Sequence, residues 1–452
     1  MKLLFLSVML ATTVAAAEPA ASLLTLDDAV ALAVKNSKVA QLAHLKTEEA
    51  TSGADAARRL RYPQVSAMGV GVYLQHSTDI KVSQGSMTPA LNELGAQLGM
   101  SPTTSALGQF PSTDLTLAKG SYTPVLGTLT VAQPLSQLWR INSGVRAAKA
   151  GLTESQRDAS RILSELRFSV EQLFVGILLE NKHLLETEAR LATQERKLRD
   201  AENAQKVGEL LDESVLGMRA AVLQAKTELT RNRQQREKLT LQLADLIGRP
   251  GDGQLTLSEK LPQREEQQIE RWLAEAKNNP DRQIAAATVE KATSAVRAAR
   301  QAHIPELSLI ASGYAQDGIP LIPRRSASVG LTLSWDVFDF GRKDAEVARS
   351  VSQRRSAEVN RDRIEEDATR QIRLAYQDLN YAKEVIGLAQ QALEYRQRAV
   401  QLSRQSTANG LALATVALEA EAELRKAETD LAGAHYQQHL ALLRLYLLAG
   451  KL

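Results

Sequence analysis

The side chains that could do chemistry are few in this sequence and are not arranged for catalysis. There is no cysteine, which removes thiolate nucleophiles, thiolate metal ligands and disulfides. The six histidines and six methionines are scattered, with no His-x-Met run, so no metal site is expected. The Gly69-Val70-Gly71 pattern lies in a strand-like segment rather than before a helix, which argues against a dinucleotide site. Gly-x-Ser-x-Gly and Gly-Lys-Ser/Thr motifs are absent. We therefore predict no enzyme activity and no cofactor.

Composition favours long helices packed through narrow seams. Aromatic residues make up 4% of the 452 residues, and the chain has only 25 glycines and 13 prolines. The net charge is +3, from 55 basic and 52 acidic residues. This balance indicates no basic face for nucleic acid, so no nucleic-acid partner is expected.

The first residues are typical of a secretory signal. Lys2 supplies a positive charge, an apolar run extends to Ala11, and Ala15-Ala16-Ala17 is a small-residue cleavage site. We expect a signal peptide at 1–17; the alternative is a buried N-terminal helix. Lipoprotein acylation is not expected, since it needs a cysteine. No later run of about 18 apolar residues occurs, so an exported chain would cross a membrane only as a barrel.

An internal repeat organises the rest of the chain. Gly208 matches Gly410 at 410 − 208 = 202, and Gly248 matches Gly450 at the same offset. Upstream, Pro63 matches Pro305 at 305 − 63 = 242, so the first copy holds 40 extra residues. The sequence thus predicts two structural repeats, at 18–260 and 261–452.

Strand-like alternation occurs twice in each repeat. In the last such segment Val329, Leu331 and Leu333 form an apolar face opposite small and polar residues. The four predicted strands are about 62–76, 121–135, 304–316 and 326–338. Aromatic residues gather near them, as in the girdle of an outer-membrane barrel. A soluble β-sandwich is the alternative.

Helical patterns surround the strands. Apolar heptads predict helical hairpins at about 138–248 and 340–449, with turns at Gly208 and Gly410. Asp212 or Thr415 is expected to cap the returning helix. A short helix opens each repeat, and Ala-rich helices at 38–60 and 281–303 precede the strands. We expect these to stack end to end with the shorter returning helices.

Four strands cannot close a barrel, and open edges are not tolerated in lipid. Two copies would give eight strands and three copies twelve, wide enough for a lumen; closed symmetry favours the trimer. The predicted fold class is an α/β membrane protein. It is a trimeric 12-stranded outer-membrane β-barrel, with four strands per chain, continued by a long periplasmic α-helical coiled-coil barrel.

The chain resembles the TolC-like outer-membrane efflux proteins over its mature length. The resemblance rests on the opening at 24–30, Tyr62-Pro63, the segment at 131–135, the segment at 334–342 and the paired tips. It implies a homotrimer in the outer membrane of a Gram-negative bacterium, surrounded by lipid and extending into the periplasm. It also implies docking on a periplasmic adaptor protein and an inner-membrane pump.

The resemblance also implies site residues. Adaptor-docking tips would be Val207, Gly208, Glu209, Leu210 and Leu211, with Gly410, Leu411, Ala412 and Leu413. The alternative is that each is a simple helical turn. The family's acidic pore constriction falls on Val416 and Glu419, so one acid is missing; a solvated helix face is the alternative.

The predicted function is a passive exit duct of a tripartite efflux or type I secretion system. A structural or adhesive coiled-coil surface protein is the alternative. The extra segment, about 77–120, would be an extracellular loop that serves as a lid or a receptor; the alternative is an inert variable loop. The cargo, whether drug, metal ion or protein, does not follow from the sequence.

Overall fold

The computed structural model describes residues 23–76, 79–98, 109–249 and 255–452. The expected signal peptide at 1–17 lies outside them. The chain forms two compact units. The helical unit comprises Met1–Glu49, Thr153–Ala287 and Glu358–Leu452, and the sheet unit comprises Ala50–Leu152 and Thr288–Ala357. Each unit takes segments from both predicted repeats, so the units do not coincide with 18–260 and 261–452. That division stays a prediction.

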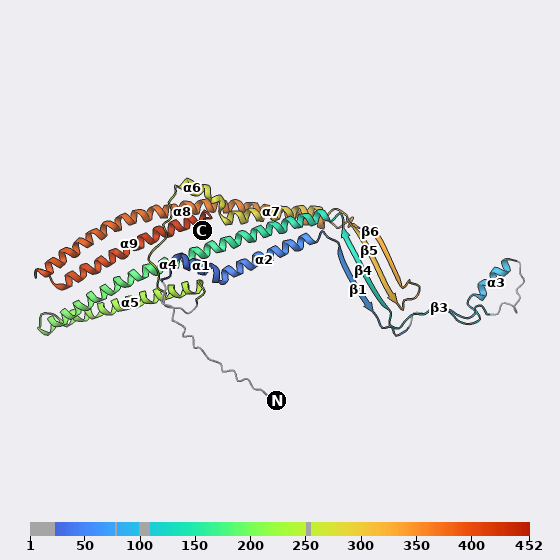
Figure 1. Cartoon of the computed structure of the whole chain (residues 1–452), viewed down its shortest axis with the longest axis horizontal. Coiled ribbons are helices and arrows are strands. Elements are labelled where there is room, and N and C mark those ends of the chain that lie inside the picture. The colour runs from blue at the N-terminus through green and yellow to red at the C-terminus, as the bar shows by residue number, and fades with distance from the viewer. Residues whose placement is uncertain (1–22, 77–78, 99–108, 250–254) are drawn as a thin grey trace, which may run out of the picture. The chain divides into compact units, whose positions relative to one another are not determined.

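The sheet unit is built on one antiparallel sheet with the order β1-β4-β5-β6 (Figure 1). Its strands are β1 (Gln64–Gly71), β4 (Val125–Pro134), β5 (Glu306–Asp317) and β6 (Arg325–Ser334). The central pair, β4 and β5, joins the two halves of the chain, with Thr130 opposite Ser312. Within the described residues β1 and β6 are edge strands, so each leaves one row of backbone groups unpaired.

The strands are shorter than predicted at most ends. β1 has 8 residues, although Val72 N donates to Pro124 O at 3.2 Å and Leu74 N to Tyr122 O at 2.8 Å beyond it. β6 ends at Ser334 instead of about 338. The cause is Asp339, whose carboxylate accepts from Gly341 N at 3.2 Å and from Lys343 N at 3.1 Å. This cap starts the next helix and pulls the preceding residues out of the sheet.

Long helical hairpins dominate the helical unit (Figure 1, green and orange to red). The first is α4 (Leu138–Lys206) with α5 (Asp212–Leu246), and the second is α8 (Arg342–Ala408) with α9 (Ala414–Leu448). The remaining helices of this architecture are α1 (Leu26–Asn36), α2 (Lys38–Arg59), α6 (Ile269–Glu275) with a 3₁₀ turn at Ala276–Asn278, and α7 (Pro280–Gln301).

Helix starts follow local capping. Thr25 caps α1, accepting from Asp28 N at 3.2 Å. Pro280 is the first residue of α7. Asn279 Oδ1 accepts from Asp281 N at 2.8 Å, so the Asn-Pro pair starts the helix.

No helix among the described residues is long and apolar enough to span a membrane.

Two equivalent apolar cores hold the helical unit together. In one, α1 packs on the middle of α4 and the end of α5; in the other, α6 packs on α8 and the end of α9. Residues of the first core recur 202 positions later in the second: Val170 and Ile372, Ile177 and Leu379, Leu243 and Leu445, Ile247 and Ala449. The repeat in sequence is therefore also a repeat in packing.

The ends of short helices meet the ends of the returning helices. Asn36 Nδ2, at the end of α1, donates to Ile247 O after α5 at 3.0 Å. Asn279 Nδ2, before α7, donates to Leu448 O at the end of α9 at 2.9 Å. These bonds satisfy carbonyls that a helix end leaves unpaired. They join the pieces end to end in the way the sequence predicts.

The extra segment of the first repeat has secondary structure of its own, which the prediction of a loop at 77–120 missed. It contains β2 (Ile80–Val82) paired with β3 (Leu115–Ala118), and helix α3 (Thr88–Gln97). Residues 77–78 and 99–108 lie outside the described residues. The equivalent connection between β5 and β6 is a short turn at Gly318, where φ is +84°.

Candidate functional site

The two predicted tips share one backbone geometry. At the first, Gly208 has φ +80°, its N donates to Gln205 O at 3.0 Å, and Glu209 N donates to Ala204 O at 2.9 Å. At the second, Gly410 has φ +73°, its N donates to Thr407 O at 3.1 Å, and Leu411 N donates to Ser406 O at 2.8 Å. This is the Schellman ending, which needs a residue with positive φ and so favours glycine.

The predicted caps of the returning helices were wrong. The N-cap residues are Leu211 and Leu413, both in extended backbone and neither making a side-chain cap. Asp212 and Thr415 lie inside the helices. The chain needs three residues after each glycine to reverse direction, so the N-cap position falls on a leucine in both hairpins.

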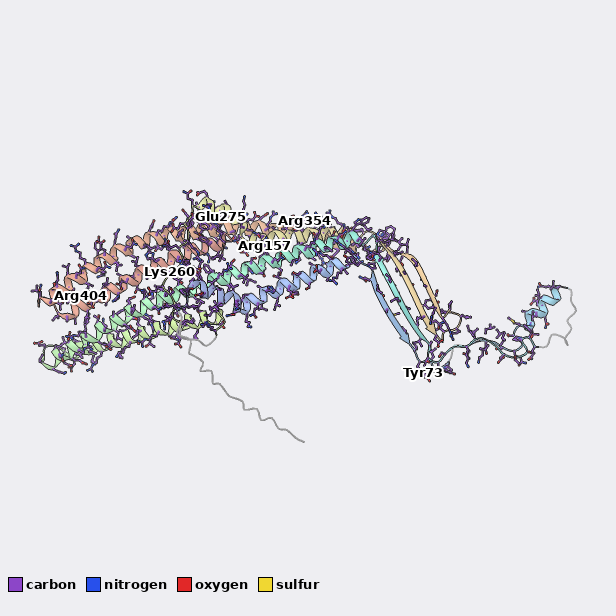
Figure 2. All side chains as sticks on the ribbon, in the orientation of Figure 1. Tyr73, Arg157, Lys260, Glu275, Arg354 and Arg404 are labelled. Atoms are coloured by element: carbon purple, nitrogen blue, oxygen red, sulfur yellow. The ribbon has the colours of Figure 1, made fainter. Side chains whose placement is uncertain are left out.

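These tip positions expose leucine and valine to solvent. Val207 is 69% exposed, Leu211 75%, Leu411 81% and Leu413 75%. Glu209 is also exposed, whereas Leu210 and Ala412 are half-buried. Both tips lie at the same end of the helical unit, and Arg404 marks the second (Figure 1, Figure 2). Exposed apolar side chains are therefore gathered at the end of each helical hairpin.

A charged pair braces each hairpin just behind its tip, with opposite polarity in the two repeats. In the first, Glu202 on α4 accepts from Arg219 on α5 at 2.9 Å. In the second, Arg404 on α8 donates to Glu421 on α9 at 2.7 Å. The positions correspond, since 404 − 202 = 202 and 421 − 219 = 202. The interaction is kept while acid and base have exchanged helices.

The predicted constriction residues lie on the first turns of α9. Val416 is 43% exposed, and its carbonyl accepts from Ser403 Oγ at 3.4 Å. The Glu419 carboxylate is 46% exposed and pairs with Lys197 of α4. Next to this pair, Thr193 Oγ1 donates to Leu418 O at 3.2 Å. The pair therefore links the outgoing helix of the first hairpin to the returning helix of the second.

Sequence reasoning missed Lys197. The repeat carried the signal, because the position equivalent to Lys197 is Ala399 and the position equivalent to Glu419 is Gly217. Lys197 and Glu419 are therefore both residues that differ from their equivalents in the other repeat, and they pair between α4 and α9.

A buried ionic cluster fixes the segment between the repeats. Glu171 on α4 is 2% exposed; its carboxylate pairs with Arg264, whose Nη2 donates to Oε2 at 2.8 Å. His439 Nε2 on α9 lies 2.6 Å from Glu171 Oε1. Burial alone would raise the pKa of Glu171, but the hydrogen bonds from His439 and Arg264 outweigh it and hold the pKa below its ordinary value. Arg264 also lies over the ring of Tyr446, 5.7 Å from its centroid.

His439 forms a pair with His435 that the prediction of scattered histidines overlooked. His435 and His439 are four residues apart on α9, the spacing of helical metal ligands. His439 instead pairs with the Glu171 carboxylate. Among the described residues no group of three or more histidine, aspartate or glutamate side chains could hold a metal ion.

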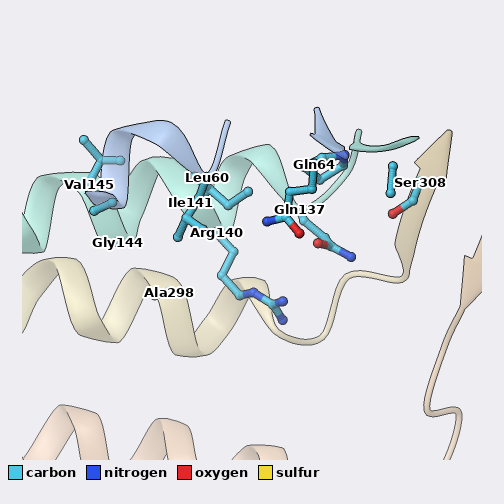
Figure 3. Close-up of a pocket in the computed structure, with 12 residues that line it drawn as sticks. Leu60, Gln64, Gln137, Arg140, Ile141, Gly144, Val145, Ala298 and Ser308 are labelled. Atoms are coloured by element: carbon cyan, nitrogen blue, oxygen red, sulfur yellow. The ribbon is translucent and has the colours of Figure 1, made fainter. Parts of the chain in front are cut away.

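A cavity of about 580 Å³ lies in the sheet unit, at the junction of strands and helices (Figure 3). Leu60, Ile141 and Val145 supply apolar lining. Among its polar residues, Arg140 pairs with Glu306 at 2.6 Å and Gln137 Nε2 donates to Glu306 Oε2 at 2.9 Å. These contacts join α4 to the start of β5, so the cavity's polar groups serve the junction itself.

Solved structures with this architecture include an outer-membrane channel and other membrane proteins. The chain is similar to the Campylobacter jejuni outer membrane channel CmeC, with TM-score 0.74 and 16% identity over 94% of this chain and 85% of that one. It is also similar to the Vibrio cholerae outer membrane protein VceC, with TM-score 0.72 and 17% identity over 94% and 96%. A Pseudomonas aeruginosa membrane protein matches with TM-score 0.71 and 18% identity over 94% and 93%.

The predicted fold class is confirmed: one four-stranded sheet and two long helical hairpins per chain form the protomer fold of TolC-like outer-membrane channels. Residues 274–451 match the model of the outer membrane efflux protein family, and this stretch lies within the second repeat. The resemblance to outer-membrane efflux proteins that the sequence indicated is therefore found again in the second repeat. This match and the shared fold support the predicted localisation, the outer membrane with an extension into the periplasm, and the predicted role of an outer-membrane efflux channel. No curated protein matches the sequence.

Proposed function

We propose that the chain is the passive exit duct of a tripartite efflux or type I secretion assembly. Three copies supply twelve strands to one barrel, and six helical hairpins continue it into the periplasm. The hairpin tips dock on a periplasmic adaptor, and an inner-membrane pump drives transport. The duct itself performs no reaction.

Two structural features support this arrangement. The sheet ends in the open edges β1 and β6, and only pairing with other copies satisfies these backbone groups in lipid. The tips repeat one geometry in both halves and expose apolar side chains at one end of the helical unit. The paired tips are the observation that carries the docking proposal, because six equivalent apolar turns match a partner arranged around the same axis.

Cross-linking from the tips tests the docking. Each introduced thiol would be unique, since the chain has no cysteine. We expect Leu211→Cys and Leu411→Cys, carrying a photo-activated cross-linker in whole cells, to capture an adaptor protein identified by mass spectrometry. Tyr395→Cys is the matched control: it is 70% exposed and lies about 20 Å along α8 from Gly410. Labelled tips that capture no adaptor would refute docking there.

The narrow end of the duct is proposed to lie at Val416 and Glu419, near the second tip. Lys197 balances Glu419 within each protomer, so the ring of three carboxylates carries little net charge. Removing Lys197 therefore leaves the three Glu419 carboxylates without a counter-charge and makes the pore more negative, although the number of acidic residues is unchanged.

Lys197→Met is expected to raise the preference of the open duct for cations over anions. An uncompensated charge a few ångströms from a permeating ion is worth roughly 1 kcal/mol in water, or about fivefold in selectivity. Glu419→Gln should shift the preference in the opposite direction. Reversal potentials in planar bilayers under a salt gradient measure both effects. Lys226→Met is the control, because its partner Glu195 lies 3.3 Å away within the first hairpin. Equal reversal potentials for all three variants would place Glu419 outside the pore.

A further inference from the structure

The extra segment of the first repeat is ordered without a core of its own. Over described residues 79–98 and 109–120 every apolar side chain is exposed or half-buried. Hydrogen bonds still define its shape: Gln84 N donates to Asp114 Oδ1 at 2.7 Å, and Thr88 Oγ1 accepts from Phe110 N at 2.8 Å. A folded segment in which no apolar side chain is fully buried gains little stability from its own chain and needs apolar surface from elsewhere.

Helix α3 carries the surface that needs covering. Met87, Leu91, Leu94 and Leu98 follow one another at spacings of 4, 3 and 4, which places them on one face of the helix. They are 48%, 36%, 54% and 69% exposed. We call these four residues the α3 stripe. A helix of ten residues is marginal in water by itself, so packing of this stripe supplies its stability.

The chain connectivity identifies what covers the stripe. The segment leaves the sheet from the end of β1, an edge strand that needs a second copy of the chain beside it. The second repeat has only a short turn at the equivalent place, so an assembly of three chains carries three α3 helices at one mouth of the barrel. Tethering three identical stripes to one rim gives them a high effective concentration.

Charge favours the same partner. Glu93 is the only charged residue within α3, and it does not belong to the stripe. Lys81 of β2 and Asp79, the residue before β2, pair with each other at 3.6 Å. Three α3 helices can therefore approach without like charges meeting, and the 4, 3, 4 spacing matches the seam of a small helical bundle.

We infer that the α3 stripes of three chains pack against one another and form a helical cluster over the outer mouth of the barrel. The partner of this surface is a second and third copy of the same chain. The inference rests on the proposed three-copy assembly.

Single thiols test the cluster. Leu94→Cys and Leu91→Cys, oxidised with copper phenanthroline in intact cells, are expected to give disulfide-linked dimers on reducing-agent-free denaturing gels. Asn92→Cys is the matched control: it lies on the same helix, outside the stripe, and is exposed. We expect at least tenfold more dimer from the stripe positions than from Asn92→Cys.

Two further measurements separate the outcomes. Unheated gel electrophoresis shows whether each variant is a trimer, and maleimide labelling shows whether its thiol is accessible. A trimer whose stripe thiols form no more dimer than Asn92→Cys would overturn the cluster while leaving the duct intact. The cluster would also be overturned, with the duct intact, if a lipid-borne photoprobe labelled Leu94→Cys while Leu94→Cys formed no cross-link to a second chain. Absence of any trimer would overturn both the cluster and the proposed assembly.

Discussion

Replacing Leu211 and Leu411 together by aspartate is expected to abolish export while the duct still assembles in the outer membrane. The two leucines are 75% and 81% exposed at equivalent tips, so neither supports the folded chain. Burying a leucine side chain against a partner contributes about 1.5–3 kcal/mol, and each trimer presents six such positions. An aspartate there must also lose its hydration on docking.

The expected loss is large because docking uses all six tips at once. A cost of about 1.4 kcal/mol per contact is a tenfold loss of affinity, and the losses compound around the ring. Export of a known cargo, or susceptibility to a toxic one, should fall to the level of a strain without the duct.

The matched control keeps the size and apolarity of the tips. Leu211→Met with Leu411→Met conserves volume and should keep export close to normal. Amounts of trimer in outer-membrane fractions must be equal in both variants. Normal export by the aspartate variant at that amount would mean that the tips do not dock through these side chains.

Glu171→Gln is expected to be the most destabilising single change in the helical unit. The Glu171 carboxylate is nearly inaccessible and receives hydrogen bonds from Arg264 and His439 on two separate segments. Removing one charge of a buried pair costs about 3–5 kcal/mol, because the other charge stays buried without its counterion. The segment that carries Arg264 should then detach from α4 and α9.

Proteolysis reports this release directly. Trypsin should cleave after Lys260 or Arg264 at a lower temperature in Glu171→Gln than in the wild type. Glu259→Gln is the matched control in the same segment: Glu259 is 77% exposed and lies 3.5 Å from Lys182. Exposed pairs of this kind contribute about 0–1 kcal/mol, so its cleavage should hardly change. Equal cleavage of both variants would show that the buried cluster does not hold the segment.

The effect also has a defined pH dependence. The folded-state pKa of Glu171 lies below its ordinary value of 4.5, so the pair stabilises the fold fully above that pH. The stabilisation is lost as pH falls below 4.5 through the folded-state pKa. The difference in unfolding temperature between wild type and Glu171→Gln, followed by circular dichroism because trypsin is inactive in acid, should therefore be constant near neutral pH and shrink in acid.

Features that depend on neighbouring residues in sequence were predictable. The heptads and the lack of proline between Pro134 and Pro250 placed α4 at its observed ends. The two glycines marked the tips, since a Schellman ending requires positive φ. Alternation located all four strands, with errors only at their ends.

Features that depend on tertiary contact were not predictable in the same way. Nothing local marks Glu171, Arg264 and His439 as partners, because they come from three separate segments. Helix α3 was missed because one short amphipathic stretch among serine, threonine and glycine gives too little periodicity. Lys197 was missed because the acid was considered without the helix opposite it, although the repeat distinguished both positions.

The exchanged charges behind the two tips determine which returning helix pairs with which outgoing helix. Two similar hairpins in one chain invite the wrong return helix to pair with an outgoing helix. In the hairpin register, α4 with α9 would set Glu202 against Glu421, and α8 with α5 would set Arg404 against Arg219. Correct partners attract and exchanged partners repel, so duplication did not make the hairpins interchangeable. A chimaera carrying the same hairpin twice would lose that distinction at all six hairpins of the proposed trimer.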